Sequence, residues 1–200
     1  MKKLITWRGD ILKKFKFFLI ILYFIIQPTL TSASERWILD TSLSTVDFEL
    51  PVLFAKNVKG KFNSIEGFVE LDVTEKDNNK AIFSVQISDI DMNYIKYKDL
   101  LLSSIFFDAE NFPKAVVDTK KFSYVNEKEL ELKIELSIKG KNEIVPLKIY
   151  ITRLAEELVQ IQSELVFSRT AYNIGIGNWR NTSILKDNVK LKANLFLFRE

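Results

Sequence analysis

Three pairs of carboxylates are the side chains whose types and spacing could support acid–base chemistry. Catalysis of this kind needs groups placed within hydrogen-bond reach of one reacting molecule. Each pair lies beside an expected turn or strand end, where a solvated charge is ordinary, and no spacing places two acids across a cleft. The pairs are Glu156 with Glu157, Asp89 with Asp91, and Asp108 with Glu110.

The residues that most enzymes use for catalysis near neutral pH are missing. The chain has no histidine and no cysteine. This excludes Ser-His-Asp and Cys-His catalysis, thiolate chemistry, and imidazole ligation of metal or haem. We therefore predict that the protein is not an enzyme and holds no metal or other cofactor. A hydrolase or isomerase that works with carboxylates alone is the remaining enzymatic alternative.

One arginine sits among aromatic and glycine residues near the end of the chain. Arg169 follows an expected strand and precedes Gly175-Ile-Gly177, and Trp179 lies beyond that turn. An arginine at the mouth of a β-barrel can hold a phosphate or another polar head group. A structural arginine that ties down a long loop has the same sequence signature. Both interpretations stay open at this point.

The first 33 residues have the order of a secretory signal peptide. Six basic residues lie within positions 2–16, ten apolar residues follow at 17–26, and Thr31-Ser-Ala33 supplies small residues for cleavage. We expect cleavage after Ala33 and a mature domain of residues 34–200, periplasmic or secreted from a bacterium. Because a membrane span needs about 17–25 apolar residues, we expect no stable membrane insertion after cleavage. An uncleaved anchor is the alternative.

The basic character of the chain belongs to this leader. Of 29 Lys and Arg and 26 Asp and Glu, the leader holds six and one, so residues 34–200 carry a net charge of −2. That balance does not favour nucleic-acid binding. Without cysteine, neither a lipid anchor on cysteine nor a disulfide is available, and the domain must be stabilised by burial.

Apolar and polar residues alternate from Trp37 onward, which is typical of strands with one buried face. The clearest row is Leu130, Leu132, Ile134, Leu136 and Ile138. Similar rows occupy 46–50, 69–73, 83–87, 145–151, 159–167 and 189–197, and polar turns are expected at 77–80, 126–128, 140–143 and 186–188. The fold class is therefore all-β, with about eight antiparallel strands in one domain. A closed up-and-down barrel and a two-sheet sandwich fit this pattern equally well.

The segment 98–114 interrupts the alternation. Leu101, Leu102, Ile105 and Phe106 have helical spacing, and Asp99 is expected to cap a short helix. Pro113 ends any helix. We expect a short helical insertion near 98–112 that lies across the β-structure, with its phenylalanines pointing inward.

Several stretches together resemble the YceI-like family of polyisoprenoid-binding, lipocalin-like periplasmic proteins. The resemblance covers nearly all of the mature chain in the right order. The stretches are Trp37-Ile-Leu-Asp40, Ser44-Thr-Val-Asp-Phe48, Val58-Lys-Gly-Lys-Phe62, Ile65-Glu-Gly67, Phe106-Phe-Asp108 with Phe112-Pro113, Leu136-Ser-Ile-Lys-Gly140 with Val145-Pro-Leu147, and Ser168-Arg169 with Tyr172-Asn-Ile-Gly175 and Asp187-Asn-Val189.

The resemblance implies a lipocalin-like β-barrel that sequesters a polyisoprenoid or another long-chain amphiphile. Family members usually carry a histidine in the second strand and another in the central motif, but Val52 and Leu101 stand at these places here. Any role that rests on those histidines is not available to this protein.

We predict an exported carrier that holds a lipid tail in the barrel, with the segment 101–112 closing one end and Arg169 facing a head group. A ligand-free interaction or stress-protection module with the same barrel is the alternative, and the oligomeric state stays open, a dimer included. The expected ligand-binding residues are Phe48, Val85, Ile87, Leu101, Phe106, Leu132, Ile134, Leu136, Leu147, Ile149, Leu165, Phe167, Arg169, Trp179, Leu191 and Leu195.

Overall fold

The computed structural model describes residues 34–125 and 128–200. These residues belong to one compact unit, Ala33–Glu200. The predicted signal peptide, 1–33, lies outside the described residues and stays a prediction. Within the described part, no helix is both long and apolar enough to cross a bilayer.

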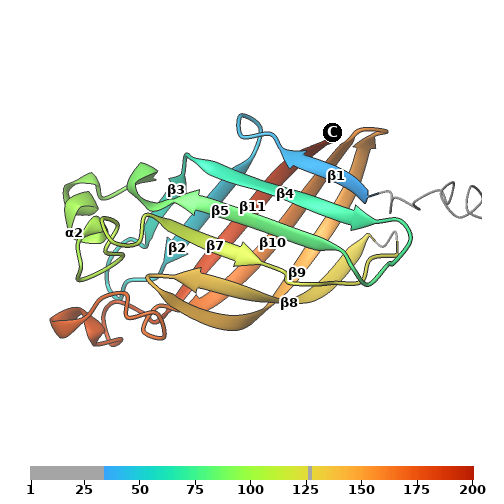
Figure 1. The fold of residues 1–200 in the computed structure, drawn as a ribbon. Helices are drawn as coiled ribbons and strands as arrows, with labels where there is room; N and C mark the ends of the chain where they lie inside the picture. Colours follow the sequence, from blue (N-terminus) through green and yellow to red (C-terminus); the bar gives the residue numbers. More distant parts are fainter. Residues whose placement is uncertain (1–33, 126–127) are drawn as a thin grey trace, which may run out of the picture. The chain divides into compact units, whose positions relative to one another are not determined.

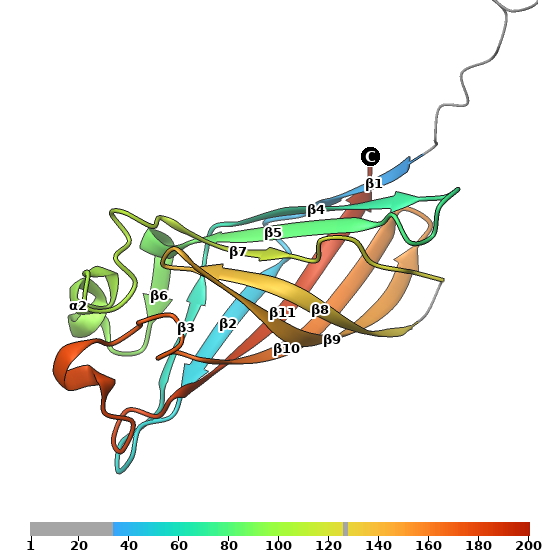
Figure 2. The same cartoon turned by 60° about the horizontal axis from the view of Figure 1, so that its bottom comes forward.

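Eight antiparallel strands form a closed ring, which confirms the predicted barrel (Figures 1 and 2). Successive ring strands pair with one another, and the pairing of β1 with β11 closes the ring. In the chain, two further strands lie between β1 and β4, and one lies between β5 and β7. The ring strands, in spatial order, are β1 (Ser34–Leu39), β4 (Ile65–Asp72), β5 (Lys80–Gln86), β7 (Lys114–Asp118), β8 (Glu129–Ile138), β9 (Lys141–Ala155), β10 (Leu158–Ser168) and β11 (Asn188–Arg199).

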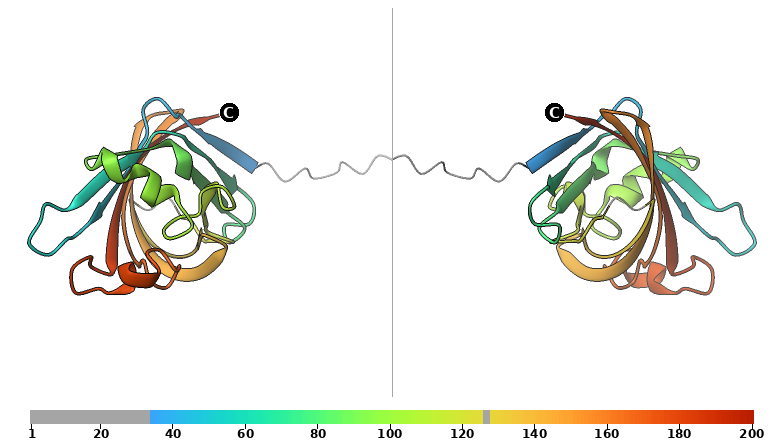
Figure 3. Two further views of the ribbon diagram at one scale, coloured as in Figure 1. Left: turned by 90° about the vertical axis from the view of Figure 1, so that its left-hand side faces the viewer. Right: turned by 90° about the vertical axis from the view of Figure 1, so that its right-hand side faces the viewer.

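Three shorter strands extend the wall at one end of the ring. They are β2 (Thr45–Leu50), β3 (Val58–Phe62) and β6 (Ile90–Met92). β11 pairs with β1 through its last residues and with β2 through Lys190–Asn194, and β2 then pairs with β3 and β3 with β6. The chain between β6 and β7 covers this end, as the view along the barrel in Figure 3 shows.

The hairpin between β8 and β9 is tighter than the predicted turn at 140–143. Ile138 pairs with Lys141, so only Lys139 and Gly140 form the turn. Both have positive φ, 50° and 69°, as the two-residue type I′ turn requires. Because this turn matches the strand twist, β9 begins two residues before the predicted turn ends.

The interruption at 98–114 contains the predicted short helix. The 3₁₀ turn η2 (Ile95–Tyr97) leads into α2 (Lys98–Leu102), and a compact turn follows. We call residues 95–112 the plug segment. The prediction that Asp99 caps the helix is wrong, because Tyr97 occupies the cap position and no side chain bonds there. Asp99 lies in the first helical turn, where its negative charge interacts favourably with the helix dipole.

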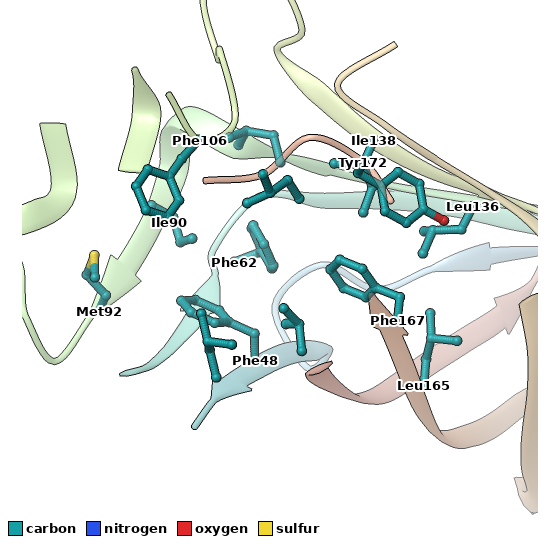
Figure 4. Close-up of a cluster of buried hydrophobic side chains, with 14 of the residues drawn as sticks. Phe48, Phe62, Ile90, Met92, Phe106, Leu136, Ile138, Leu165, Phe167 and Tyr172 are labelled. Atoms are coloured by element: carbon teal, nitrogen blue, oxygen red, sulfur yellow. The ribbon is translucent and has the colours of Figure 1, made fainter. Parts of the chain in front are cut away.

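The inward faces of the strands form two hydrophobic clusters. The larger one, which we call the plug cluster, lies beneath the plug segment and includes Phe48, Phe62, Ile90 and Phe106 (Figure 4). The smaller one surrounds Trp37, Leu195 and Leu197. Side chains of the plug segment pack into the larger cluster, and we therefore call this the sealed end of the barrel.

We expect Ile90→Ala to lower the free energy of unfolding by about 2–5 kcal/mol, because the truncated side chain leaves a void in a packed cluster. Ile90 is 1% exposed. Urea unfolding followed by circular dichroism measures the change. The matched control is Ile144→Ala, at a side chain that is 62% exposed, where a change below about 0.5 kcal/mol is expected. Equal losses at both positions would contradict the placement of β6 in the core.

Candidate functional site

The barrel encloses one large cavity of about 660 Å³. All eight ring strands contribute to its wall, and most of the lining side chains are aliphatic or aromatic. The volume lies within the range of about 300–1,000 Å³ that is typical of small-molecule sites. The chemistry this site offers is therefore the removal of apolar surface from water.

Eleven of the sixteen predicted ligand-binding residues line this cavity. Their side chains belong to the inward rows of strands β5, β8, β9, β10 and β11, with Ile87 just after β5. The eleven are Val85, Ile87, Leu132, Ile134, Leu136, Leu147, Ile149, Leu165, Phe167, Leu191 and Leu195.

The other five predicted residues lie outside the lining. Phe48, Leu101 and Phe106 pack in the cluster beneath the plug segment, with Phe48 against Phe62 at a ring distance of 5.8 Å. Trp179 stacks edge-on against Phe106 at 5.6 Å and is 40% exposed. The structure thus brings four of the five together at the sealed end of the barrel as its closure, and Arg169 lies nearby.

Neighbouring phenylalanines of the plug segment have different surroundings. Phe106 is buried within the plug cluster, whereas Phe107 lines the cavity. The turn between them is fixed by hydrogen bonds from the Phe107 N–H to Leu101 O, 3.0 Å, and from the Phe106 N–H to Ser103 O, 3.0 Å. Phe107 is the side chain through which the plug segment meets the cavity. The phenylalanines of this segment were expected to point inward, but only Phe106 was among the predicted ligand-binding residues.

Arg169 is fully buried and binds the backbone of the loop that follows it. Its Nε donates to Lys186 O at 2.9 Å, its Nη1 to Ile174 O at 2.9 Å and its Nη2 to Leu185 O at 2.8 Å. Gly175, with φ of +78°, lets this loop approach the guanidinium, since a Cβ there would lie 2.7 Å from Nη1. Of the two interpretations left open by the sequence, this geometry matches the structural arginine that ties down a long loop.

The surroundings of Arg169 are electrostatically balanced. Burial lowers the pKa of its guanidinium, and the neighbouring Asp187 carboxylate opposes this effect. Burial alone raises the pKa of Asp187, but hydrogen bonds from Ser168 and Thr170 and the charge of Arg169 bring it below its ordinary value. The opposite charges of Arg169 and Asp187 therefore favour each other's ionised form at this end of the barrel.

Tyr172 packs under the same loop. Its ring meets that of Phe167 edge-on at 5.4 Å (Figure 4). Burial raises the pKa of Tyr172 to about 12, and the charge of Glu143 adds to the effect. The Tyr172 ring therefore packs in the hydrophobic cluster behind Phe167, which itself lines the cavity.

The cavity reaches solvent at the end opposite the plug segment. Lys128 and Arg153 line it and are exposed, and Glu35 lines it and is half-buried. Trp37 lies just inside, with the guanidinium carbons of Arg153 and Arg199 each 6.0 Å from its ring. The sequence pattern missed Trp37 and Arg153, although both continue the inward rows of strands that it had identified.

The carboxylate pairs noted in the sequence lie away from the cavity. Glu156 and Glu157 form the turn between β9 and β10, and each lies within 3.7 Å of Arg199. Asp89 accepts a hydrogen bond from Ser64, and Asp108 accepts one from Asn111 at 2.9 Å. Glu35 is the one carboxylate residue in the described lining, so no pair of acids faces this site.

The sequence matches the YceI-like domain over residues 37–197. The chain belongs to the YceI-like family. The fold agrees with solved structures that include Burkholderia cenocepacia BcnA, with a TM-score of 0.71, 23% identity, and coverage of 79% of this chain and 98% of that one. No curated protein matches the chain.

Two further solved structures share the fold of this YceI-like protein. A polyisoprenoid binding domain from Saccharophagus degradans, implicated in plant cell wall breakdown, aligns with a TM-score of 0.67 at 15% identity, covering 82% of this chain and 98% of that one. The Campylobacter jejuni YceI protein aligns with a TM-score of 0.64 at 19% identity, covering 75% and 89%. At such identities the likeness shows the fold.

We expect Arg169→Met to lower the free energy of unfolding by roughly 3 kcal/mol or more, because the carbonyls of Ile174, Leu185 and Lys186 lose their buried donor. Urea unfolding measures the loss. Arg180→Met, at an exposed arginine of the same loop, is the control and should change little. An Arg169→Met variant with normal stability and impaired lipid binding would instead assign Arg169 to the ligand.

Proposed function

We propose that this protein is an exported carrier that binds a polyisoprenoid or a similar long-chain amphiphile in the barrel cavity. The observation that carries the proposal is the apolar cavity of about 660 Å³ inside the closed barrel. Membership of the YceI-like family and the fold shared with a polyisoprenoid binding domain support it. The signal-like sequence of residues 1–33 supports export.

The lining accounts for affinity without any reactive group. Each buried CH2 group contributes about 0.8 kcal/mol, so ten carbons contribute on the order of 8 kcal/mol before ordering costs are subtracted. This gross value corresponds to roughly micromolar binding. The expected contacts are the eleven lining residues named above, together with Phe107 of the plug segment. Binding by burial alone fits a chain without histidine or cysteine.

The alternative, an interaction module that works through its outer face, has one observation in its favour. Phe54 is 98% exposed and Ile184 is 64% exposed. Their two loops are joined by a hydrogen bond from the Leu53 N–H to Ile184 O at 2.9 Å. Exposed apolar side chains brought together in this way are typical of contact surfaces. A carrier and an interaction module differ in whether the cavity holds a ligand.

We expect protein purified from its own host to carry a lipid. Native mass spectrometry should show a bound mass of several hundred daltons or more, and denaturing extraction should release a long-chain amphiphile. The physical reason is that an apolar cavity open to solvent gains free energy when hydrocarbon replaces water in it. Protein that releases no lipid and takes none from vesicles would contradict the carrier function.

Filling the cavity should abolish binding. Ala193 lines the cavity from the middle of β11, facing Val46 of β2 and Ser163 of β10. We expect Ala193→Phe to weaken binding of a long-chain alcohol by about tenfold or more, measured by the change in tryptophan fluorescence in a Trp179→Phe background that leaves Trp37 in the barrel, while the protein stays folded by circular dichroism. Lys192→Phe places the same side chain on the exposed outer face of β11 and should bind normally. Equal affinity in both variants would place the ligand outside the barrel.

A further inference from the structure

The two ends of the cavity differ in chemistry. At the end beneath the plug segment the lining consists of buried apolar side chains, including Phe62, Ile87 and Ile138. At the other end the lining includes Glu35, Lys128 and Arg153. An amphiphile in this cavity therefore contacts apolar side chains at the closed end and charged side chains at the end that is open to solvent.

The charged residues of the mouth continue the inward rows of their strands. Lys128 precedes Leu130 and Leu132 at the start of β8, and Ile151 donates its N–H to Lys128 O at 2.8 Å. Arg153 follows Ile149 and Ile151 on β9. Since side chains alternate along a strand, both cations lie on the faces that enclose the cavity.

Arg153 is held in place by its own hairpin. Its Nε donates to Ala155 O at 3.3 Å and its Nη2 to Glu156 O at 2.7 Å. These bonds leave Nη1 for another acceptor. Among the described residues no carboxylate lies within 4.0 Å of Arg153 or Lys128, whereas the neighbouring Arg199 has Glu156 and Glu157 at 3.6 and 3.7 Å.

We infer that this mouth binds an anionic head group, of the phosphate ester class, with Arg153 and Lys128 as its ligands and the lipid tail directed toward the plug segment. The inference rests on the proposed carrier function and adds the orientation and charge of the ligand. Guanidinium and ammonium groups suit phosphate oxygens. Among the described lining residues of the mouth, two are cations and one, Glu35, is a carboxylate, and this balance favours an anion.

The position of this site separates it from Arg169. That arginine lies near the sealed end and donates to backbone carbonyls, so it has no role in this inference. The places where the family's histidines are expected, Val52 and Leu101, also belong to the sealed end, where both pack against the plug cluster. The cationic mouth therefore does not involve either of these two positions.

The test compares two probes that share a tail and differ in the head group, farnesyl phosphate and farnesol. We expect the wild-type protein to bind farnesyl phosphate more tightly. The double variant Lys128→Gln with Arg153→Gln should lose about tenfold or more in affinity for farnesyl phosphate, since hydrogen bonds to charged groups are removed. Its affinity for farnesol should stay within about twofold.

A control variant removes the same charge elsewhere. Lys133→Gln with Arg180→Gln changes one exposed lysine on the outer face of β8 and one exposed arginine at the sealed end. Both affinities should be unchanged in this control. The preference for farnesyl phosphate in the wild type should also fall as salt is raised, because exposed charges are screened.

The outcomes separate the head-group inference from the carrier function. If both probes bind and the mouth variant keeps the wild-type preference, the head-group inference is overturned and the carrier function stands. If neither probe binds the wild-type protein, both are overturned. Loss of farnesol binding in the mouth variant would show that these residues shape the cavity, which also overturns a specific role for the head group.

Discussion

The structure depends on the closure of the β-sheet into a ring. β1 contributes three residue pairs to β11, Trp37 with Arg199, Ile38 with Phe198 and Leu39 with Leu197. This seam satisfies the backbone groups that would otherwise be two free sheet edges, which attract other chains. It also fixes every inward row around a common axis. With eight strands, a ring is wide enough to hold a small ligand, so the cavity follows from the closure and not from any single residue.

A closed ring still needs an end, and two segments supply it here. The plug segment and the loop after β10 are joined by hydrogen bonds from the Gly175 and Ile176 N–H groups to Ile105 O, at 2.9 and 3.0 Å. Lys139 adds bonds from its Nζ to Ser104 O and Asn173 O. Buried Arg169 satisfies the carbonyls that this irregular backbone would otherwise leave unpaired. These polar groups form hydrogen bonds within the closed end, whereas most of the cavity wall is apolar.

The strands and the barrel could be predicted because their signal is local and repeated. The row from Leu130 to Ile138 predicts both the strand and the face that is buried, and β8 spans Glu129–Ile138. The details that failed depend on geometry beyond the pattern. The turn at Lys139-Gly140 is set by two positive φ angles, and the cap of α2 by the 3₁₀ turn before it. Neither feature is visible in the alternation of residue types.

The sequence predicted which rows of side chains face the cavity, but it did not predict where the cavity ends along each row. A row tells which side chains point inward, so Leu132, Ile149 and Leu165 were found. It does not tell where the packed core stops and the cavity begins. Phe106 and Phe107 are adjacent in sequence, yet one fills the plug cluster and the other lines the cavity. That difference is decided by the turn between them, which the sequence signals only as an interruption.

The same reasoning explains why the sequence pattern singled out Arg169 and passed over Arg153. Arg169 lies among glycines and aromatics, a setting that is typical of binding loops. Its guanidinium donates hydrogen bonds to backbone carbonyls. Arg153 lies in a strand of ordinary composition, and no sequence motif marks it. Its position at the cavity follows only from the closed barrel. Closing the ring places its strand end beside Trp37 of β1, although the two positions are far apart in the chain. A charged residue that ends an apolar inward row lies where a barrel meets water, and this is the position from which a head group can be held while the tail is buried.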